Sequence, residues 1–303
     1  MDSSSATVRK SIVSAGSERA YLIHEPVKKQ PAAAASAVEP GAALVVAFHG
    51  GYASPTHMQK LTGLDALADE HGFIVVYPEG LNRHWNDGRG DARHSNEVRA
   101  GSRFSYGDDV RFVQDLIDHL HGDHNIDKKR IYATGISNGG MFCYRVAAEL
   151  SALFAAIAPV AGGMGADTAA HFAPAHAVSV LHIHGTADTY VPYTGGPLLE
   201  GRLLGTVVSA ERSVEMWVEK DECQAGAAIT ELPASSPDDL CRVTVETHGG
   251  GIDGTEVVLY RITDGGHTWP NMKMKTNEAL GRVCRDFDAT ATIWRFFSAH
   301  PKK

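Results

Sequence analysis

The sequence predicts an α/β fold, with a mostly parallel central sheet and helices on both of its faces. Strand-length apolar runs alternate along the chain with segments whose apolar residues recur at helical spacing. The runs are apolar throughout, as in Ala42–Phe48, and this is typical of parallel strands covered on both faces. A length of 303 residues suits one domain of this kind, and no repeat or interdomain linker interrupts it. We therefore expect a single domain over residues 1–303.

The first 41 residues precede this alternating pattern. Residues 6–13 and 19–24 alternate between apolar and polar side chains, which predicts a hairpin with Ala15-Gly16-Ser17 as its turn. The Ala-rich segment 31–40 is bounded by prolines, and we expect it to be a surface loop between the hairpin and the main sheet.

Apolar periodicity and end signals predict the remaining elements. Residues 58–70 carry apolar side chains at helical spacing, and Gly72 follows as a helix-ending glycine. Residues 108–121 show the same spacing, with Asp108 or Asp109 as the N-cap. The other expected strands are 73–77, 130–134, 154–160, 178–184, 242–247 and 256–262, and the other expected helices are 138–150, 209–220 and 277–297. Little chain lies between residues 160 and 178, so no large lid is expected.

The composition disfavours several classes of function. A formal net charge of -8 argues against non-specific binding to nucleic acid. No apolar run approaches the roughly 20 residues that span a bilayer, so no membrane association is expected. The four cysteines include no CxxC pair, and neither a metal nor a cofactor is expected. Residues 1–5 lack the pattern of a signal peptide. The location is therefore cytoplasmic if Met1 is native, and secreted or periplasmic if a leader was removed. The oligomeric state stays open.

The segment Gly135-Ile136-Ser137-Asn138-Gly139 lies between a predicted strand and a predicted helix. This is the context of a nucleophile elbow, the sharp turn that exposes the serine of an α/β-hydrolase. Glycines suit the flanking positions because strand and helix approach too closely there for a Cβ atom. The sequence therefore predicts an α/β-hydrolase fold with Ser137 as its nucleophile.

A serine hydroxyl needs a base, and in this fold the chain order is serine, acid, histidine. Asp188 follows the predicted strand 178–184, and His267 follows the predicted strand 256–262. Both positions lie at the sheet edge where catalytic groups gather. Asp264 is a rival acid, but it lies only three residues before His267 on the same loop. We prefer Asp188, because it reaches the histidine from a separate strand.

The oxyanion of a tetrahedral intermediate needs donors that are already in place. The backbone N–H of Asn138, the residue after the nucleophile, is one expected donor. The loop His49-Gly50-Gly51-Tyr52 after the first buried strand should supply the other. Gly51 is the first candidate and Tyr52 the second.

These features together resemble the polyhydroxybutyrate depolymerases and feruloyl esterases, the group of carbohydrate esterase family 1 and its relatives. The similar segments are His49-Gly50-Gly51, 73–80, Trp85-Asn86-Asp87-Gly88, Asp108-Asp109-Val110, 130–140, 154–163, His184-Gly185-Thr186-Ala187-Asp188 and Gly265-Gly266-His267-Thr268-Trp269-Pro270. The resemblance implies the same triad, Ser137, Asp188 and His267. It also implies that Trp85 and Trp269 lie near the substrate cleft. A further implication is a disulfide between Cys223 and Cys241, with Cys143 and Cys284 as free thiols.

The expected activity is hydrolysis of carboxylic esters through an acyl-enzyme, without metal or cofactor. Feruloyl, aryl and short-chain acyl esters are the expected small-molecule or oligomeric substrates, and 3-hydroxybutyrate oligomers or polyhydroxybutyrate are the alternative. A serine peptidase of the same fold and a non-catalytic binding protein are the remaining rivals. A complete triad argues against the binding protein, and the lack of a second domain that gates peptide access argues against the peptidase.

Overall fold

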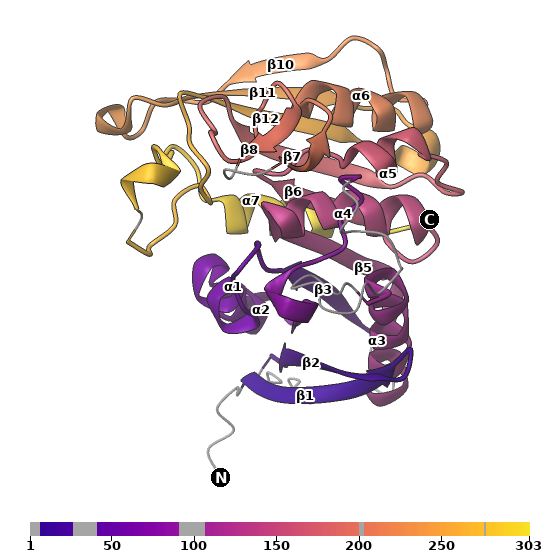
Figure 1. The fold of residues 1–303 in the computed structure, drawn as a ribbon. Coiled ribbons are helices and arrows are strands. Elements are labelled where there is room, and N and C mark those ends of the chain that lie inside the picture. Colours follow the sequence, from indigo (N-terminus) through magenta and orange to yellow (C-terminus); the bar gives the residue numbers. More distant parts are fainter. Residues whose placement is uncertain (1–6, 27–40, 91–106, 200–202, 276) are drawn as a thin grey trace, which may run out of the picture.

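The fold is built on a ten-stranded sheet with helices on both faces (Figure 1). The computed structural model describes residues 7–26, 41–90, 107–199, 203–275 and 277–303. The order of strands across the sheet is β1-β2-β4-β3-β5-β6-β7-β12-β11-β10. Their bounds are β1 Thr7–Ser14, β2 Ser17–His24, β3 Ala42–Phe48, β4 Ile74–Pro78, β5 Ile126–Ile136, β6 Ala156–Val160, β7 Ser179–Gly185, β10 Ala228–Glu231, β11 Arg242–His248 and β12 Val257–Thr263.

The centre of the sheet is parallel and its two margins are antiparallel. Strands β4, β3, β5, β6, β7 and β12 pair in parallel with one another, in that order across the sheet. The hairpin β1–β2 joins β4 antiparallel at one margin, and β11 and β10 continue antiparallel at the other. The expected mostly parallel sheet is therefore confirmed. Since the carboxyl ends of the parallel strands share one edge, the loops after them can combine into a single site.

Two apolar cores lie on opposite faces of the sheet. On one face, α3 (Asp109–Asp123), α4 (Asn138–Glu149) and α6 (Ala210–Lys220) pack against the strands. On the other face lie α1 (Pro55–Thr62), α2 (Leu64–His71) and α7 (Ala289–Ala299). Because both faces are covered, successive side chains along the central strands are all buried, and this produces the continuous apolar runs in the sequence.

The helix ends follow ordinary capping chemistry. The Asp108 carboxylate accepts a hydrogen bond from the Arg111 N–H at 2.9 Å, which confirms one of the two expected N-caps. The expected single helix over 58–70 is wrong, because Gly63 adopts a left-handed φ of 63° and separates α1 from α2. The expected helix over 277–297 is also wrong. It consists of a short 3-10 turn η4 (Glu278–Leu280), a non-helical stretch, and α7, which Asp288 caps.

Several short elements carry no periodicity that would have predicted them. They are α5 (Ala166–Ala170), the two-stranded hairpin β8 (Gly196–Leu199) and β9 (Leu203–Val207), and the edge strand β10. As expected, little chain lies between β6 and β7. The expected surface loop at 31–40 lies outside the described residues.

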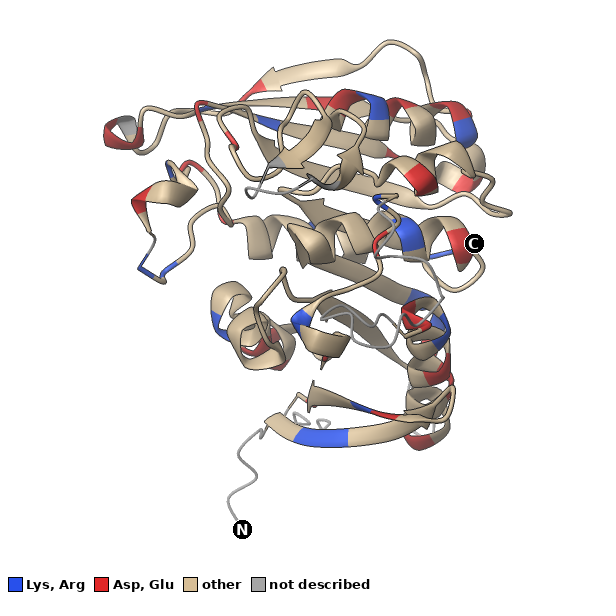
Figure 2. Cartoon of the chain, viewed as in Figure 1, with Lys and Arg blue, Asp and Glu red and all other residues tan. Residues whose placement is uncertain are grey.

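The charged residues of α3 and α6 differ in pattern. Figure 2 shows acidic and basic residues interleaved along α6, whereas α3 is mainly acidic, with four aspartates and the single arginine Arg111. None of the helices that the structure describes combines the length and apolar composition that a bilayer span requires.

Candidate active site

The residues singled out by sequence meet at the carboxyl edge of the parallel strands. Ser137 follows β5, Asp188 follows β7 and His267 follows β12. A cavity of about 190 Å³ has both Ser137 and His267 on its wall. Asp188 lies behind His267, where it is 5% exposed. The fold thus brings together three segments that are far apart in the sequence.

The turn at Ser137 has the strained backbone of a nucleophile elbow. Ser137 has a φ of 58° and a ψ of −123°, in a region that side chains disfavour. A Cβ on Gly135 would lie 2.5 Å from the carbonyl oxygen of Gly139, and a Cβ on Gly139 would lie 2.3 Å from that of Phe48. Both distances are too short for real atoms. Glycine at these two positions therefore allows strand and helix to approach closely enough to hold the serine in place.

The imidazole of His267 is hydrogen-bonded to the carboxylate of Asp188. The Nδ1 atom lies 2.7 Å from Oδ2 of Asp188, which leaves Nε2 as the ring nitrogen able to accept a proton. The other carboxylate oxygen accepts hydrogen bonds from the N–H groups of Tyr190 and Val191, both at 2.9 Å. The rival acid Asp264 is directed elsewhere, since its side chain is exposed and its carboxylate lies 3.9 Å from Arg282. Of the two acids, only Asp188 contacts the His267 ring.

A buried chain of hydrogen bonds continues from Asp188 away from the cavity. His184 Nε2 lies 2.9 Å from the Val191 carbonyl and 3.3 Å from Asp188 Oδ2. Because a carbonyl only accepts, Nε2 carries the proton, and Nδ1 then accepts from His182 Nε2 at 3.1 Å. His182 Nδ1 in turn accepts from the Tyr144 hydroxyl at 2.8 Å. Burial and the neighbouring His184 hold the pKa of His182 well below its usual value, consistent with a neutral chain.

This chain acts on the electrostatics of Asp188. Burial by itself would raise the pKa of a carboxyl group, but the hydrogen bonds from His184 and His267 outweigh it and hold the pKa of Asp188 well below its usual range. His184 belongs to one of the segments that resemble the family, yet no role was predicted for it. Its signal was the alternation of His182 and His184 in a buried strand, where neutral imidazoles need partners.

Two of the expected oxyanion donors are compatible with the geometry. Asn138 is the first residue of α4, so its N–H has no partner within the helix. A Cβ placed on Gly51 would lie 3.8 Å from the Cβ of Asn138, so the two backbones are adjacent. Among the described residues, no backbone carbonyl accepts the N–H of Gly51. The prediction of Tyr52 as the alternative donor is wrong, because its N–H already donates to the Arg83 carbonyl at 2.9 Å.

Trp85 packs beneath the loop His49-Gly50-Gly51-Tyr52 and does not line the cavity. It is fully buried, its ring stacks on Phe142, and its Nε1 donates to the His49 carbonyl at 2.9 Å. The His49 ring accepts from the Gly80 N–H at 3.0 Å, and burial lowers its pKa to about 4. Trp85 does lie near the cavity, since its backbone bonds to the Asn138 side chain, but the expected contact with substrate is wrong because its own side chain is buried in the core.

Trp269 is likewise a core residue. It is 1% exposed, and its Nε1 donates to Thr290 Oγ1 at 3.1 Å. Thr290 in turn donates to the Thr62 carbonyl at 2.7 Å. Trp269 thus ties the loop after His267 to α7 and α1, and it is no part of the cavity wall. The expected contact with substrate is wrong for this residue too.

The side chain of Asn138 is fully used within the protein. Its Oδ1 accepts from the Trp85 N–H at 2.8 Å, and its Nδ2 donates to the Trp85 carbonyl at 2.9 Å and to Asp87 Oδ2 at 2.6 Å. Asp87 also forms a buried ion pair with Arg89, whose side chain reaches the cavity wall. These contacts fix the start of α4 and leave the Asn138 backbone N–H as the group able to meet a ligand.

The rest of the cavity wall is mainly aromatic and apolar. The Tyr190 ring stacks on His267 with 5.2 Å between ring centroids, and Tyr52 packs edge-on against His84 at 4.2 Å. The apolar side chains on the wall are Met141, Val191, Leu198 and Leu280. Apart from Tyr52, which was predicted as an oxyanion donor and not as a wall residue, none of these wall residues was predicted from sequence, because they come from separate segments that carry no shared motif.

A comparison with known protein families identifies the family of this chain. The family model described as Esterase PHB depolymerase matches residues 29–190. The chain belongs to this family. The match spans the nucleophile elbow and Asp188, and His267 lies beyond it.

Individual relatives of this esterase agree with the family. NocK of Nocardia uniformis subsp. tsuyamanensis, whose name assigns it provisionally to the esterases, is 30% identical over 276 residues, 87% of this chain and 74% of NocK. Feruloyl esterase B of Piromyces equi is 27% identical over 243 residues, and Poly(3-hydroxyalkanoate) depolymerase C of Paucimonas lemoignei is 30% identical over 128. These alignments cover 77% and 42% of this chain. The chain spans only 41% and 30% of the length of these two relatives.

A solved structure shows the same fold. The acetyl xylan esterase from Aspergillus awamori matches with a TM-score of 0.58 at 13% identity, over 96% of this chain and 99% of that one. The α/β-hydrolase fold expected from the elbow motif is thus confirmed.

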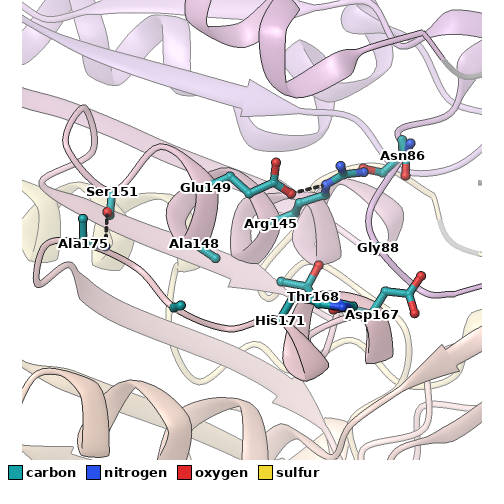
Figure 3. Close-up of a pocket in the computed structure, with 11 residues that line it drawn as sticks. Asn86, Gly88, Arg145, Ala148, Glu149, Ser151, Asp167, Thr168, His171 and Ala175 are labelled. Carbon is teal, nitrogen blue, oxygen red and sulfur yellow. Dashed lines mark hydrogen bonds and ion pairs between the residues drawn. The ribbon is translucent and has the colours of Figure 1, made fainter. Parts of the chain in front are cut away.

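A larger hollow of the esterase, of about 640 Å³, is separate from the triad residues (Figure 3). Its wall includes Asn86 and Gly88 but neither Ser137 nor His267. Several of its polar side chains are paired with one another or with the backbone. Arg145 donates to Glu149 at 2.6 Å, and Ser151 accepts from the Ala175 N–H at 3.0 Å. The smaller cavity, which holds the serine and the histidine, is therefore the candidate active site.

The cysteines of the esterase are arranged differently from the expectation. All four are thiols in this structure, and the neighbour of Cys241 is Cys284 and not Cys223, so the expected Cys223–Cys241 bridge is wrong. Cys223 is half-buried beside Thr255, whereas Cys241 lies beside Cys284. With Asp239 these two form the one metal-compatible group found among the described residues, and it lies away from the cavity.

Proposed function

We propose that this esterase hydrolyses small carboxylic esters, feruloyl or other aryl and short-chain acyl esters above all, through an acyl-enzyme on Ser137. The observation that carries the proposal is the shared cavity of Ser137 and His267, with His267 hydrogen-bonded to Asp188 at 2.7 Å. Membership of the Esterase PHB depolymerase family supports the same reaction class.

The proposed reaction begins when Ser137 Oγ attacks the ester carbonyl. His267 Nε2 takes the hydroxyl proton, while Asp188 keeps the proton on Nδ1 and stabilises the imidazolium that forms. The backbone N–H groups of Asn138 and Gly51 would stabilise the oxyanion, a type of contact whose removal costs about 10²–10³-fold in kcat. His267 then gives its proton to the leaving alcohol, and a water activated by the same base releases the acid.

The wall of the cavity supports a modest, flat or apolar acyl group. Tyr52, which is half-exposed, and Tyr190, which stacks on His267, offer aromatic surface, and Met141 and Leu198 offer apolar surface. An aromatic acyl group gains from offset or edge contacts with such rings. The name of one relative, Feruloyl esterase B, fits this chemistry. The name of another, Poly(3-hydroxyalkanoate) depolymerase C, keeps hydroxybutyrate oligomers as the alternative.

A panel of esters tests the proposal. Purified enzyme is assayed on 4-nitrophenyl acetate and butyrate, methyl ferulate and 3-hydroxybutyrate oligomers, with a matching 4-nitroanilide as the peptidase control. We expect the highest kcat/KM on the nitrophenyl esters and methyl ferulate. Higher kcat/KM on the oligomers would transfer the assignment to the alternative. Turnover of the anilide in preference to the esters would favour a peptidase, and activity on none of these substrates would favour a binding protein.

A further inference from the structure

Two cysteines outside the active site lie next to each other in the second apolar core. Cys241 immediately precedes β11 and is 4% exposed, and Cys284 lies between η4 and α7 and is 1% exposed. Their Sγ atoms, together with a carboxylate oxygen of Asp239, all lie within 4.8 Å of one another. The two thiols are close enough for a hydrogen bond between their sulfur atoms.

Backbone contacts hold the two cysteine-bearing segments side by side. Asp239 Oδ1 accepts from the Cys241 N–H at 2.8 Å, and its Oδ2 accepts from the Arg285 N–H at 2.7 Å. Asp286 adds a second link, since its carboxylate accepts from the Ser236 N–H at 3.0 Å. The proximity of the sulfurs is therefore built into the fold at several points and does not depend on one flexible side chain.

The segment that ends in Cys284 is also the support of the His267 loop. The Gly266 N–H donates to the Arg282 carbonyl at 2.9 Å, and the His267 N–H donates to the Leu280 carbonyl at 2.7 Å. Further along, the Asn271 N–H donates to the Cys284 carbonyl at 2.8 Å. A covalent bond at Cys284 would therefore anchor the segment on which the candidate base rests.

We propose that Cys241 and Cys284 are a disulfide site, which in its oxidised form fastens the support of the His267 loop to the start of β11. The proposed disulfide is independent of the choice of ester substrate. In the two-thiol form, Asp239 already accepts two backbone N–H groups, and the Cys241 thiol faces the Asp239 carbonyl at 3.6 Å. Both carboxylate oxygens of Asp239 and the Cys241 thiol thus have partners without a metal ion, and this favours a disulfide over a metal site.

The oxidation needs an external disulfide, for which glutathione disulfide is a suitable chemical class. The Cys284 thiolate attacks one of its sulfurs, so that a mixed disulfide forms and one glutathione leaves as the thiol after taking a proton. Cys241 then attacks Cys284 Sγ and releases the second glutathione. Two protons and two electrons pass from the protein to the oxidant.

Mass mapping of the whole enzyme tests the site. Native enzyme is incubated with glutathione disulfide, and a second sample is unfolded and refolded in a glutathione redox buffer, so that burial does not limit access. We expect a loss of about two mass units for the two hydrogens removed, a cross-linked pair of peptides containing Cys241 and Cys284, and free thiols at the remaining cysteines. The melting temperature should rise by about 5 °C, as expected when a disulfide closes the loop from Cys241 to Cys284 in a chain of 303 residues.

Single-cysteine variants distinguish this disulfide from a different pairing and from a metal site. Cys241→Ser and Cys284→Ser should each abolish the cross-link and the oxidant-dependent rise in melting temperature, and the control Cys223→Ser should keep both. Four free thiols after both treatments would overturn the proposal, as would a cross-link that includes Cys223. The proposal would also be overturned, in favour of a metal site, if the wild type retained one equivalent of zinc and both Cys241→Ser and Cys284→Ser lost it.

Discussion

His184 Nε2 lies 3.3 Å from Asp188 Oδ2, the same carboxylate oxygen that accepts from His267 Nδ1 at 2.7 Å. Since both contacts are buried, the orientation of the candidate acid depends on a histidine that never reaches the cavity. His182 and Tyr144 fix the tautomer of that histidine from behind. The candidate site is therefore supported by a polar chain that runs into the core.

This arrangement predicts that His184 is a positioning residue. His184→Ala removes a hydrogen bond from Asp188, so we expect kcat to fall by about 10- to 100-fold while KM changes little. His184→Gln, which keeps a donor, should restore part of the loss. Tyr144→Phe, at the far end of the chain, serves as the control and should lose less than threefold. If the three variants instead lost kcat in proportion to the fall in their melting temperatures, with no recovery in His184→Gln, the role of His184 would be purely structural.

Ser137→Ala should leave a folded protein whose ester turnover falls by several orders of magnitude, because the attacking oxygen is gone. Labelling by a fluorophosphonate probe should disappear in the same variant. Thermal melting checks the fold. If more than a tenth of the activity survived, the nucleophile would have to be another residue.

Asp188→Asn should lower kcat by roughly 10⁴-fold, because an amide favours the wrong tautomer of His267. The exposed Asp264 is the matched control, since it lies close in sequence to His267 without contacting its ring. Asp264→Asn should therefore change kcat by less than about threefold. The reverse ranking of the two variants would move the role of the acid to Asp264.

The buried carboxyl of Asp221 should make the stability of the protein depend on pH. Its Oδ1 has no hydrogen-bond partner among the described residues, and burial raises its pKa from 3.8 to about 7. The folded-state pKa lies above the unfolded one, so the stabilising contribution of this group is full below about pH 4 and is lost as the pH rises to 7. His49, whose pKa is lowered to about 4, acts in the opposite direction between pH 6.5 and 4.

A comparison of two proteins isolates this effect from that of His49. Asp221→Asn removes the titration, so its free energy of unfolding, relative to wild type, should rise between pH 4.5 and 7.5 by on the order of 3 kcal/mol. Urea unfolding at a series of pH values measures this difference. A difference that stays constant over the whole range would show that Asp221 does not titrate there.

Much of the candidate site could be predicted from sequence because its signals are local. The glycines around Ser137 reflect the close approach of strand and helix at the turn, and Asp188 and His267 each follow an apolar run of strand length that the structure shows to be a strand of the central sheet. The mostly parallel sheet followed from the same runs, since burial on both faces leaves no polar alternation. The two helix predictions that failed had the wrong bounds: one helix is interrupted at Gly63, and the other begins only after Asp288. Such bounds depend on the backbone conformation of single residues.

What the sequence by itself determined was therefore the fold class and the three residues at the strand ends, because each has a cause within a few positions of the chain. Only the tertiary structure decided which partner each side chain meets. It buried Trp85 and Trp269 in the cores, bonded the Tyr52 N–H to Arg83, and placed Cys241 beside Cys284 instead of Cys223. These outcomes depend on how separate segments pack together, and close packing between distant segments leaves no periodic trace in the sequence.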